Sequence, residues 1–156
     1  MSTITEHIDV EAPIGPVYDR WTRFERFPEF MEGVEEVRQL DDRRLHWKAK
    51  IAGVEREWDA EITEQHPEER VAWKSTSGLN NAGVVTFHKL DPTHTRVTLQ
   101  QDVEAEGAAE KAADALGGIT RQAKNDLSRF AELMRDQGGP AEGGWRLDGE
   151  KFYSTG

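Results

Sequence analysis

The central part of the chain, from Val34 to Glu104, alternates between apolar and polar residues with a period near two. Alternation of this kind predicts β-strands with one buried face and one face in water. Turn-forming residues break the pattern at 41–42, 52–53, 66–67, 78–81 and 91–92. These breaks divide the segment into six strands at hairpin spacing. Residues 3–10 alternate in the same way, which predicts a further strand near the start of the chain.

The residues between the first two predicted strands suit short helices. Pro16 is favourable in the first turn of a helix, where its missing N–H is not needed. Apolar residues then recur at helical spacing at Val17, Tyr18, Trp21 and Phe24. Residues 27–31 begin a second short helix or turn, so we expect two short helical pieces before Val34.

The segment from 108 to 135 changes to a period of 3.6 residues, which predicts a long helix. Its apolar stripe consists of Ala109, Ala112, Leu116, Ile119, Ala123, Leu127, Phe130 and Met134. A helix of this size would be about 42 Å long. We expect Gly117 and Gly118 to interrupt and bend it, because glycine is a poor helix former.

The strands beside Ala52-Gly53 can be paired residue by residue if these two residues form the turn. The inward pairs are then Leu45–Ala60, Trp47–Trp58, Ala49–Arg56 and Ile51–Val54. The outward pairs, Arg44–Glu61, His46–Asp59, Lys48–Glu57 and Lys50–Glu55, join basic residues or histidine to acids, which supports this register. The inward face continues on the next strand at Val71, Trp73 and Ser75. In the last hairpin, a five-residue turn at 91–95 would place Phe87 opposite Leu99 and Val85 opposite Gln101.

The predicted sheet is apolar on one face, and that face must be covered. The C-terminal helix carries the long apolar stripe that suits this purpose. A run of antiparallel strands followed by one long helix predicts an α+β fold. A curved sheet around one helix leaves a wedge-shaped interior, which is a ligand pocket wherever side chains do not fill it.

Composition narrows the range of functions. The chain of 156 residues has 30 acidic and 20 basic side chains and a formal net charge of -10. This charge argues against nucleic acid and anionic membrane surfaces as partners, since both attract basic proteins. The absence of cysteine excludes disulfides, thiolate metal sites and a cysteine nucleophile. No apolar run is long enough to span a bilayer and the N-terminus does not resemble a secretory signal, so we expect a cytoplasmic domain.

An uneven distribution of glycine divides the chain into a body, residues 1–136, and a tail, residues 137–156. Six of the 14 glycines fall after Gln137. The tail is either a disordered end or a docking segment. It carries Trp145, Arg146, Phe152 and Tyr153, which are residue types typical of protein interfaces. In the second interpretation, these four residues bind the body or a protein partner.

Three segments of the body resemble a known family. They are residues 12–21, in which Ala12-Pro13 precedes the first helix; residues 24–34, which contain the aromatic-Pro-x-aromatic-Met sequence; and residues 83–87 followed by 95–99. Together with the predicted order of elements, they resemble the polyketide cyclase/dehydrase and lipid-transport group of the START-like helix-grip superfamily. That group includes coenzyme-Q-binding relatives.

The resemblance, which covers about residues 1–136, implies a seven-stranded curved antiparallel sheet around a long C-terminal helix, with two short helices after the first strand. It also implies a hydrophobic small-molecule ligand, such as a polyketide, a lipid or a quinone, and no cofactor. The family's enzymes fold and dehydrate poly-β-keto chains. The matching motifs are architectural and contain no catalytic group.

The candidate ligand contacts face inward in the predicted sheet. Trp47, Trp58, Trp73 and Phe87 either form an aromatic wall for a flat or long apolar ligand or pack as core. Ser75 is an inward polar candidate, and Gln101 is either a ligand contact or a core amide that is satisfied within the protein. Arg56 faces Ala49, and a buried guanidinium needs a partner. It would therefore meet an acid, reach the pocket mouth or hold a carbonyl or phosphate of the ligand; alternatively, it extends into water.

The sequence contains no strong sign of catalysis. Its histidines lack metal-ligand spacing, and it has no Gly-x-Ser-x-Gly elbow, phosphate-binding loop or dinucleotide glycine pattern. Arg56 is a weak catalytic candidate that would polarise a carbonyl. Three functions therefore stay open: a polyketide cyclase that holds its chain in a reactive geometry, a passive lipid or quinone carrier, and a module that recruits a protein partner through the tail.

Overall fold

A computed structural model describes residues 2–51, 53–78, 81–103 and 109–136 of the chain. In chain order its elements are β1 (Ser2–Val10), α1 (Ile14–Trp21), the 3-10 helix η1 (Phe24–Glu29), β2 (Val34–Gln39), β3 (Arg44–Ile51), β4 (Val54–His66), β5 (Arg70–Gly78), β6 (Asn81–Asp91), β7 (His94–Val103) and α2 (Ala109–Asp136). The strands form one antiparallel sheet in the order β1-β7-β6-β5-β4-β3-β2.

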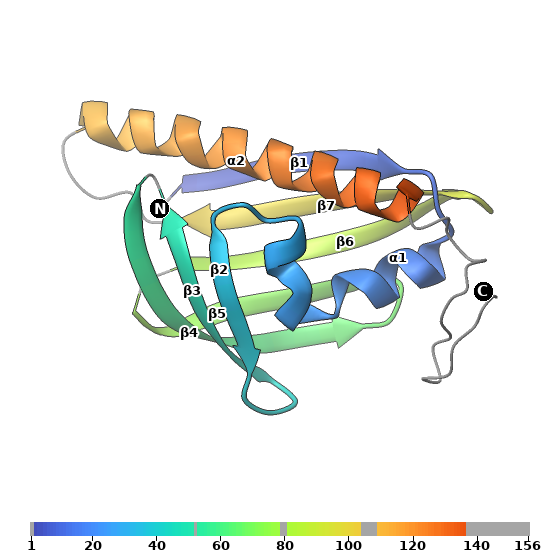
Figure 1. The fold of residues 1–156 in the computed structure, drawn as a ribbon, viewed down its shortest axis with the longest axis horizontal. Helices are drawn as coiled ribbons and strands as arrows, with labels where there is room; N and C mark the ends of the chain where they lie inside the picture. The colour runs from blue at the N-terminus through green and yellow to red at the C-terminus, as the bar shows by residue number, and fades with distance from the viewer. Residues whose placement is uncertain (1, 52, 79–80, 104–108, 137–156) are drawn as a thin grey trace.

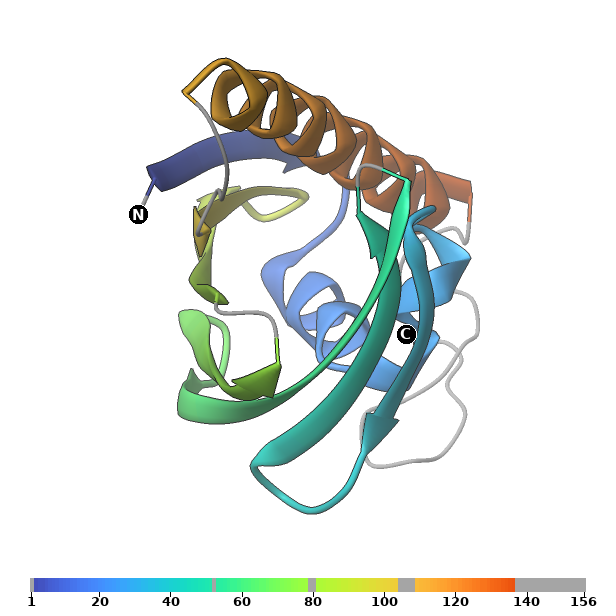
Figure 2. The same cartoon turned by 90° about the vertical axis from the view of Figure 1, so that its left-hand side faces the viewer.

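The sheet curls strongly, and α2 lies along its open side next to β1 (Figures 1 and 2). The short helices α1 and η1 lie on the same concave side of the sheet (Figure 2). This arrangement confirms the predicted α+β helix-grip fold, with two short helical pieces after the first strand. Within the described part of the chain, no helix is both long and apolar enough to cross a membrane.

The strand registers confirm one predicted hairpin and correct the other. Strands β3 and β4 pair as predicted, with Trp47 opposite Trp58. In the β6–β7 hairpin, Phe87 lies opposite Val97, so the predicted partner, Leu99, was wrong by two residues. The predicted pair Val85–Gln101 was wrong by the same shift. Val85 lies opposite Leu99, and Gln101 lies opposite Gly83. The reason is a tighter turn, in which Asp91 pairs with His94 and the Asp91 carboxylate accepts a hydrogen bond from the backbone N–H of Thr93 at 2.8 Å. A shift of two residues leaves each side chain on its predicted face.

Helix α2 runs through Gly117 and Gly118 without a break, so the predicted interruption was wrong. One glycine in a helix costs only about 1 kcal/mol. The buried part of the stripe, Ala123, Leu127, Phe130 and Met134, packs against the core and offsets this cost. Helix α1 begins at Ile14, which places Pro16 in its first turn, while Phe24 belongs to η1.

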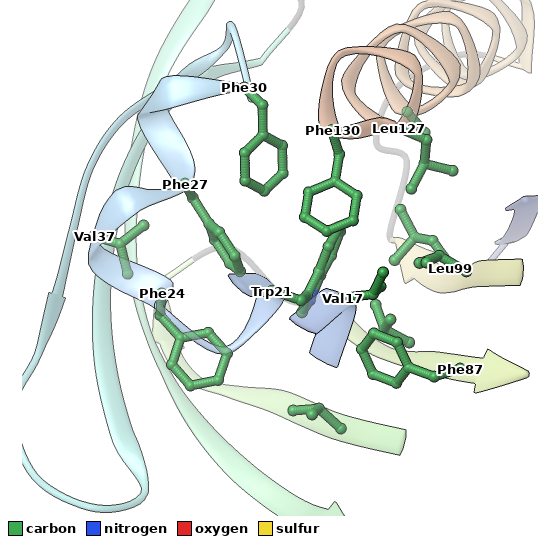
Figure 3. Packing of buried hydrophobic residues seen from close by; sticks show 14 of the residues in the cluster. Val17, Trp21, Phe24, Phe27, Phe30, Val37, Phe87, Leu99, Leu127 and Phe130 are labelled. Atoms are coloured by element: carbon green, nitrogen blue, oxygen red, sulfur yellow. The ribbon is translucent and has the colours of Figure 1, made fainter. Parts of the chain in front are cut away.

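An aromatic cluster fills the interior beneath α1, η1 and the second half of α2 (Figure 3). Phe130 of α2 lies 5.1 Å from both Trp21 and Phe30, measured between ring centroids. Phe27 joins the same group at 5.5 Å from Trp21 and 5.6 Å from Phe30. This half of the wedge is therefore packed with side chains.

Polar contacts fasten α2 to the segment between η1 and β2. The Arg129 side chain donates through Nε to the carbonyl oxygen of Phe30 at 3.0 Å and through Nη2 to Asp126 at 2.8 Å. Asp126 also accepts the backbone N–H of Glu32 at 3.4 Å. Burial raises the pKa of Asp126 to about 6, although the bond from Arg129 opposes the rise. The contacts with Phe30 and Glu32 help to hold α2 over the concave face, whereas the Arg129–Asp126 bond lies within α2.

Candidate functional site

The candidate site lies on the concave face of the sheet, where three residues from adjacent strands stand side by side. Trp73 of β5 pairs with Gly83 of β6, and Gly83 pairs with Gln101 of β7. Ile62 of β4 and Ile4 of β1, both buried, continue this line at its two ends. We call Trp73, Gly83 and Gln101 the Trp73 row.

The indole of Trp73 occupies the space above Gly83. A Cβ atom added to Gly83 would lie 2.4 Å from Cζ2 of Trp73 and 2.9 Å from Cε2, so any side chain there would displace the ring. Trp73 is partly exposed, whereas Trp21, Trp47 and Trp58 are buried. The Trp73 ring is therefore available to a ligand in a way that the other three described tryptophans are not.

Polar groups accompany this ring. Gln101 and Ser75 are both partly buried on the inner face. Ser75 lies opposite Ala60, and its hydroxyl oxygen accepts the backbone N–H of Asn81 at 3.0 Å. Among the described residues, no hydrogen bond engages the Gln101 amide or the Trp73 indole N–H. The structure thus brings Trp73, Ser75 and Gln101 to one face of the sheet, where an aromatic ring accompanies the Gln101 amide and the Ser75 hydroxyl.

The other predicted aromatic contacts belong to the packed core. Trp47 and Trp58 stack with their rings 5.6 Å apart and only 7° from parallel. Trp47 also lies 5.5 Å from Phe27, and Phe87 lies 5.4 Å from Tyr18. These contacts support the packing interpretation for Trp47, Trp58 and Phe87. Any ligand contact by these three residues stays a prediction.

Arg56 lies opposite Ala49, as predicted, but its side chain is exposed. This exposure agrees with the alternative in which Arg56 extends into water, because Arg56 is two residues from Val54, where β4 begins. In the part of the chain that the structure describes, the buried arginine is Arg20 of α1, which forms an ion pair with Glu29 and whose pKa is lowered by burial. Helical spacing from Val17 places Arg20 on the buried face of α1, a signal that the sequence interpretation missed.

Glu6 is a second residue that the sequence interpretation missed. It lies between Ile4 and Ile8 on the inner face of β1, opposite Leu99, and is partly exposed. Its position follows from the alternation of residues 3–10, which already placed Ile4 and Ile8 on one side. Glu6 and Gln101 are diagonal neighbours on adjacent strands, a spacing of about 7–8 Å. This register places the Glu6 carboxylate beside one end of the Trp73 row.

The remaining predictions concern the tail residues and metal binding. Trp145, Arg146, Phe152 and Tyr153 lie outside the described residues, as does the whole predicted tail. The described residues contain no cluster of three or more metal-ligating side chains. Among the described residues of the inner face, Trp73 offers aromatic contact, Gln101 and Ser75 offer hydrogen bonds, and Glu6 offers a carboxylate.

Comparison with known proteins identifies the family of the chain. A family model described as polyketide cyclase/dehydrase and lipid transport matches residues 10–132. An uncharacterized 17.2 kDa protein of Streptomyces lincolnensis, from the melC2-rnhH intergenic region, is 48% identical over 147 residues, which are 94% of this chain and 97% of that protein.

Solved structures share the architecture. The Zhui aromatase/cyclase from Streptomyces sp. R1128 superposes with a TM-score of 0.78 at 16% identity, over 88% of this chain and 98% of that one. A START superfamily protein from Mycobacterium smegmatis gives a TM-score of 0.70 at 15% identity, over 84% and 98% of the two chains. At these identities the likeness shows the fold alone.

Proposed function

Because the chain belongs to the polyketide cyclase/dehydrase and lipid-transport family, we propose that it binds a hydrophobic small molecule against the Trp73 row. The observation that carries this proposal is the partly exposed indole of Trp73, which lies over Gly83 and beside the unengaged Gln101 amide. Ligand sites of small molecules are typically apolar surfaces with a few convergent polar groups. The Trp73 row has this composition.

The energetics favour a ligand that is mostly apolar. Contact with Trp73 removes apolar surface from water, which contributes about 25 cal/mol for each Å² buried. The hydroxyl of Ser75 and the amide of Gln101 then orient the ligand rather than supply most of its affinity. Arg56 lies on β4 six residues before Ile62, the partner of Trp73, and is therefore away from the Trp73 row. Because its guanidinium is exposed, we propose only a minor role for it.

A second candidate function is cyclisation of a bound poly-β-keto chain, and Glu6 is the observation that favours it. Its carboxylate would remove a proton from a methylene between two carbonyls. The resulting enolate carbon would attack a second carbonyl carbon of the same chain, forming a C–C bond and an alkoxide. Gln101 would donate a hydrogen bond to that developing oxyanion. The alkoxide would then take up the proton from Glu6, and loss of water would complete the reaction.

Binding is tested by native mass spectrometry and thermal shift with three probes: myristate, a short-chain ubiquinone analogue and dihydroxyanthraquinone. We expect at least one probe to bind with unit stoichiometry. Trp73→Ala should weaken that binding at least about tenfold, which corresponds to about 1.4 kcal/mol. The matched control is Lys74→Ala, since Lys74 is the next residue of β5 and is exposed on the opposite face. Binding of no probe, or equal effects of the two substitutions, would contradict the proposal.

A further inference from the structure

Gly83 provides the space that the Trp73 indole occupies over β6. We propose that Gly83 is a specificity-determining residue, because it lets the Trp73 indole lie across β6 and form a flat surface that selects oxygen-substituted ring systems over extended acyl chains. This inference rests on the proposed function. It deepens that function by naming the ligand class.

The geometry shows how the ring depends on the glycine. Three consecutive atoms of the six-membered ring, Cε2, Cζ2 and Cη2, lie 2.9, 2.4 and 3.0 Å from the position of a Cβ on Gly83. These similar distances place the ring across the glycine rather than edge-on beside it. Glycine weakens a strand interior, and it often marks a close approach by another group. Here the approaching group is the indole.

An indole in this position favours flat ligands for two physical reasons. Aromatic rings that stack on one another gain about 0.5–1.5 kcal/mol beyond the burial of their area. An acyl chain gains no such contact and loses more conformational freedom when it is immobilised. A flat ligand on Trp73 would also present its edge to Gln101, the residue on the other side of Gly83. The amide there can bond an oxygen in the plane of the ring, as a quinone or phenol would provide.

The alternative is that Gly83 only provides space for Trp73 to pack. In that case a substitution at Gly83 would change stability and leave the preference between ligand classes as it was. Selectivity is therefore the decisive measurement, and affinity for a single probe is not sufficient.

The experiment compares two probes with equal numbers of carbon atoms, dihydroxyanthraquinone and myristate, by isothermal titration calorimetry. We expect the wild-type protein to bind the anthraquinone at least about tenfold more tightly than myristate. Gly83→Ala should lower anthraquinone affinity at least about tenfold while changing myristate affinity much less. The control is Gly117→Ala, since a Cβ at Gly117 meets nothing within 4 Å. It should leave both affinities unchanged.

A double variant keeps the test valid if Gly83→Ala folds poorly. Trp73→Phe/Gly83→Ala removes the atoms that the new methyl would meet, so it should fold and should bind the two probes with reduced discrimination. Unchanged selectivity in Gly83→Ala or in the folded double variant would overturn the inference. Equal or tighter myristate binding by the wild type would also overturn it, yet would leave the proposed function standing. Failure of every probe would refute the proposed function itself.

Discussion

Replacing Phe130 with alanine is expected to lower the free energy of unfolding by about 3–5 kcal/mol, the usual loss for a large buried aromatic. The Phe130 side chain is fully buried, and its ring lies 5.1 Å from both Trp21 and Phe30. It is the point at which α2 joins the aromatic cluster (Figure 3). The substitution therefore leaves a cavity between α2 and the short helices.

Urea unfolding followed by circular dichroism measures this loss. A domain of this kind has a free energy of unfolding of about 5–15 kcal/mol. The variant is therefore expected either to be folded in the absence of urea or to be close to unfolding. Phe130→Leu, which retains more volume, should lose less. Ser128→Ala, on the exposed side of α2, is the control and should change stability little. A loss below about 1 kcal/mol for Phe130→Ala would contradict the packing described above.

Asp126→Asn is expected to stabilise the protein at neutral pH, by up to about 3 kcal/mol. Burial raises the pKa of Asp126 from 3.8 to about 6, and one pKa unit corresponds to about 1.4 kcal/mol. Because the pKa is raised on folding, the folded state favours the protonated carboxyl. The stability from this group is complete below pH 3.8 and is lost as the pH rises through about 6. Asparagine stays neutral and retains an oxygen that can accept the Glu32 N–H.

The measurement is urea unfolding of wild type and variant across this pH range. The stability advantage of Asp126→Asn should be small near pH 4, grow between pH 4 and 6, and level off above that range, which follows from the shift in pKa. Glu132→Gln makes the same charge change at an exposed position on the same helix and should show no such step. A variant that is less stable than wild type at neutral pH would show that the ionised carboxylate and Arg129 stabilise the fold.

The sequence predicted the fold well because its signals are local and repeated. Alternation defined the strands, and a change of period marked α2. The charge pairs across the β3–β4 hairpin fixed its register, so the facing of Trp47 and Trp58 was correct. The error of two residues in the β6–β7 hairpin left each side chain on its predicted face, since side chains alternate between the two faces with a period of two.

The site was harder to predict because alternation gives the face of a side chain and not its depth. Arg56 and Trp47 share the inner face, yet the first is exposed and the second is buried. The contact between Trp73 and Gly83 joins two strands and depends on the rotation of the indole. That rotation is set by packing, which no local pattern records. Glu6, in contrast, follows from the alternation of β1, which places it on the inner face between Ile4 and Ile8.

The central claim, that a ligand binds on the inner face at the Trp73 row, is tested most directly by the indole N–H signals of the isotope-labelled protein in NMR spectra. The chain has five tryptophans, and tryptophan-to-phenylalanine variants assign their signals. When the tightest-binding probe is added, the Trp73 signal should shift most. Saturable binding that leaves the Trp73 signal unmoved, with the largest shift at Trp145 in the tail, would contradict the claim.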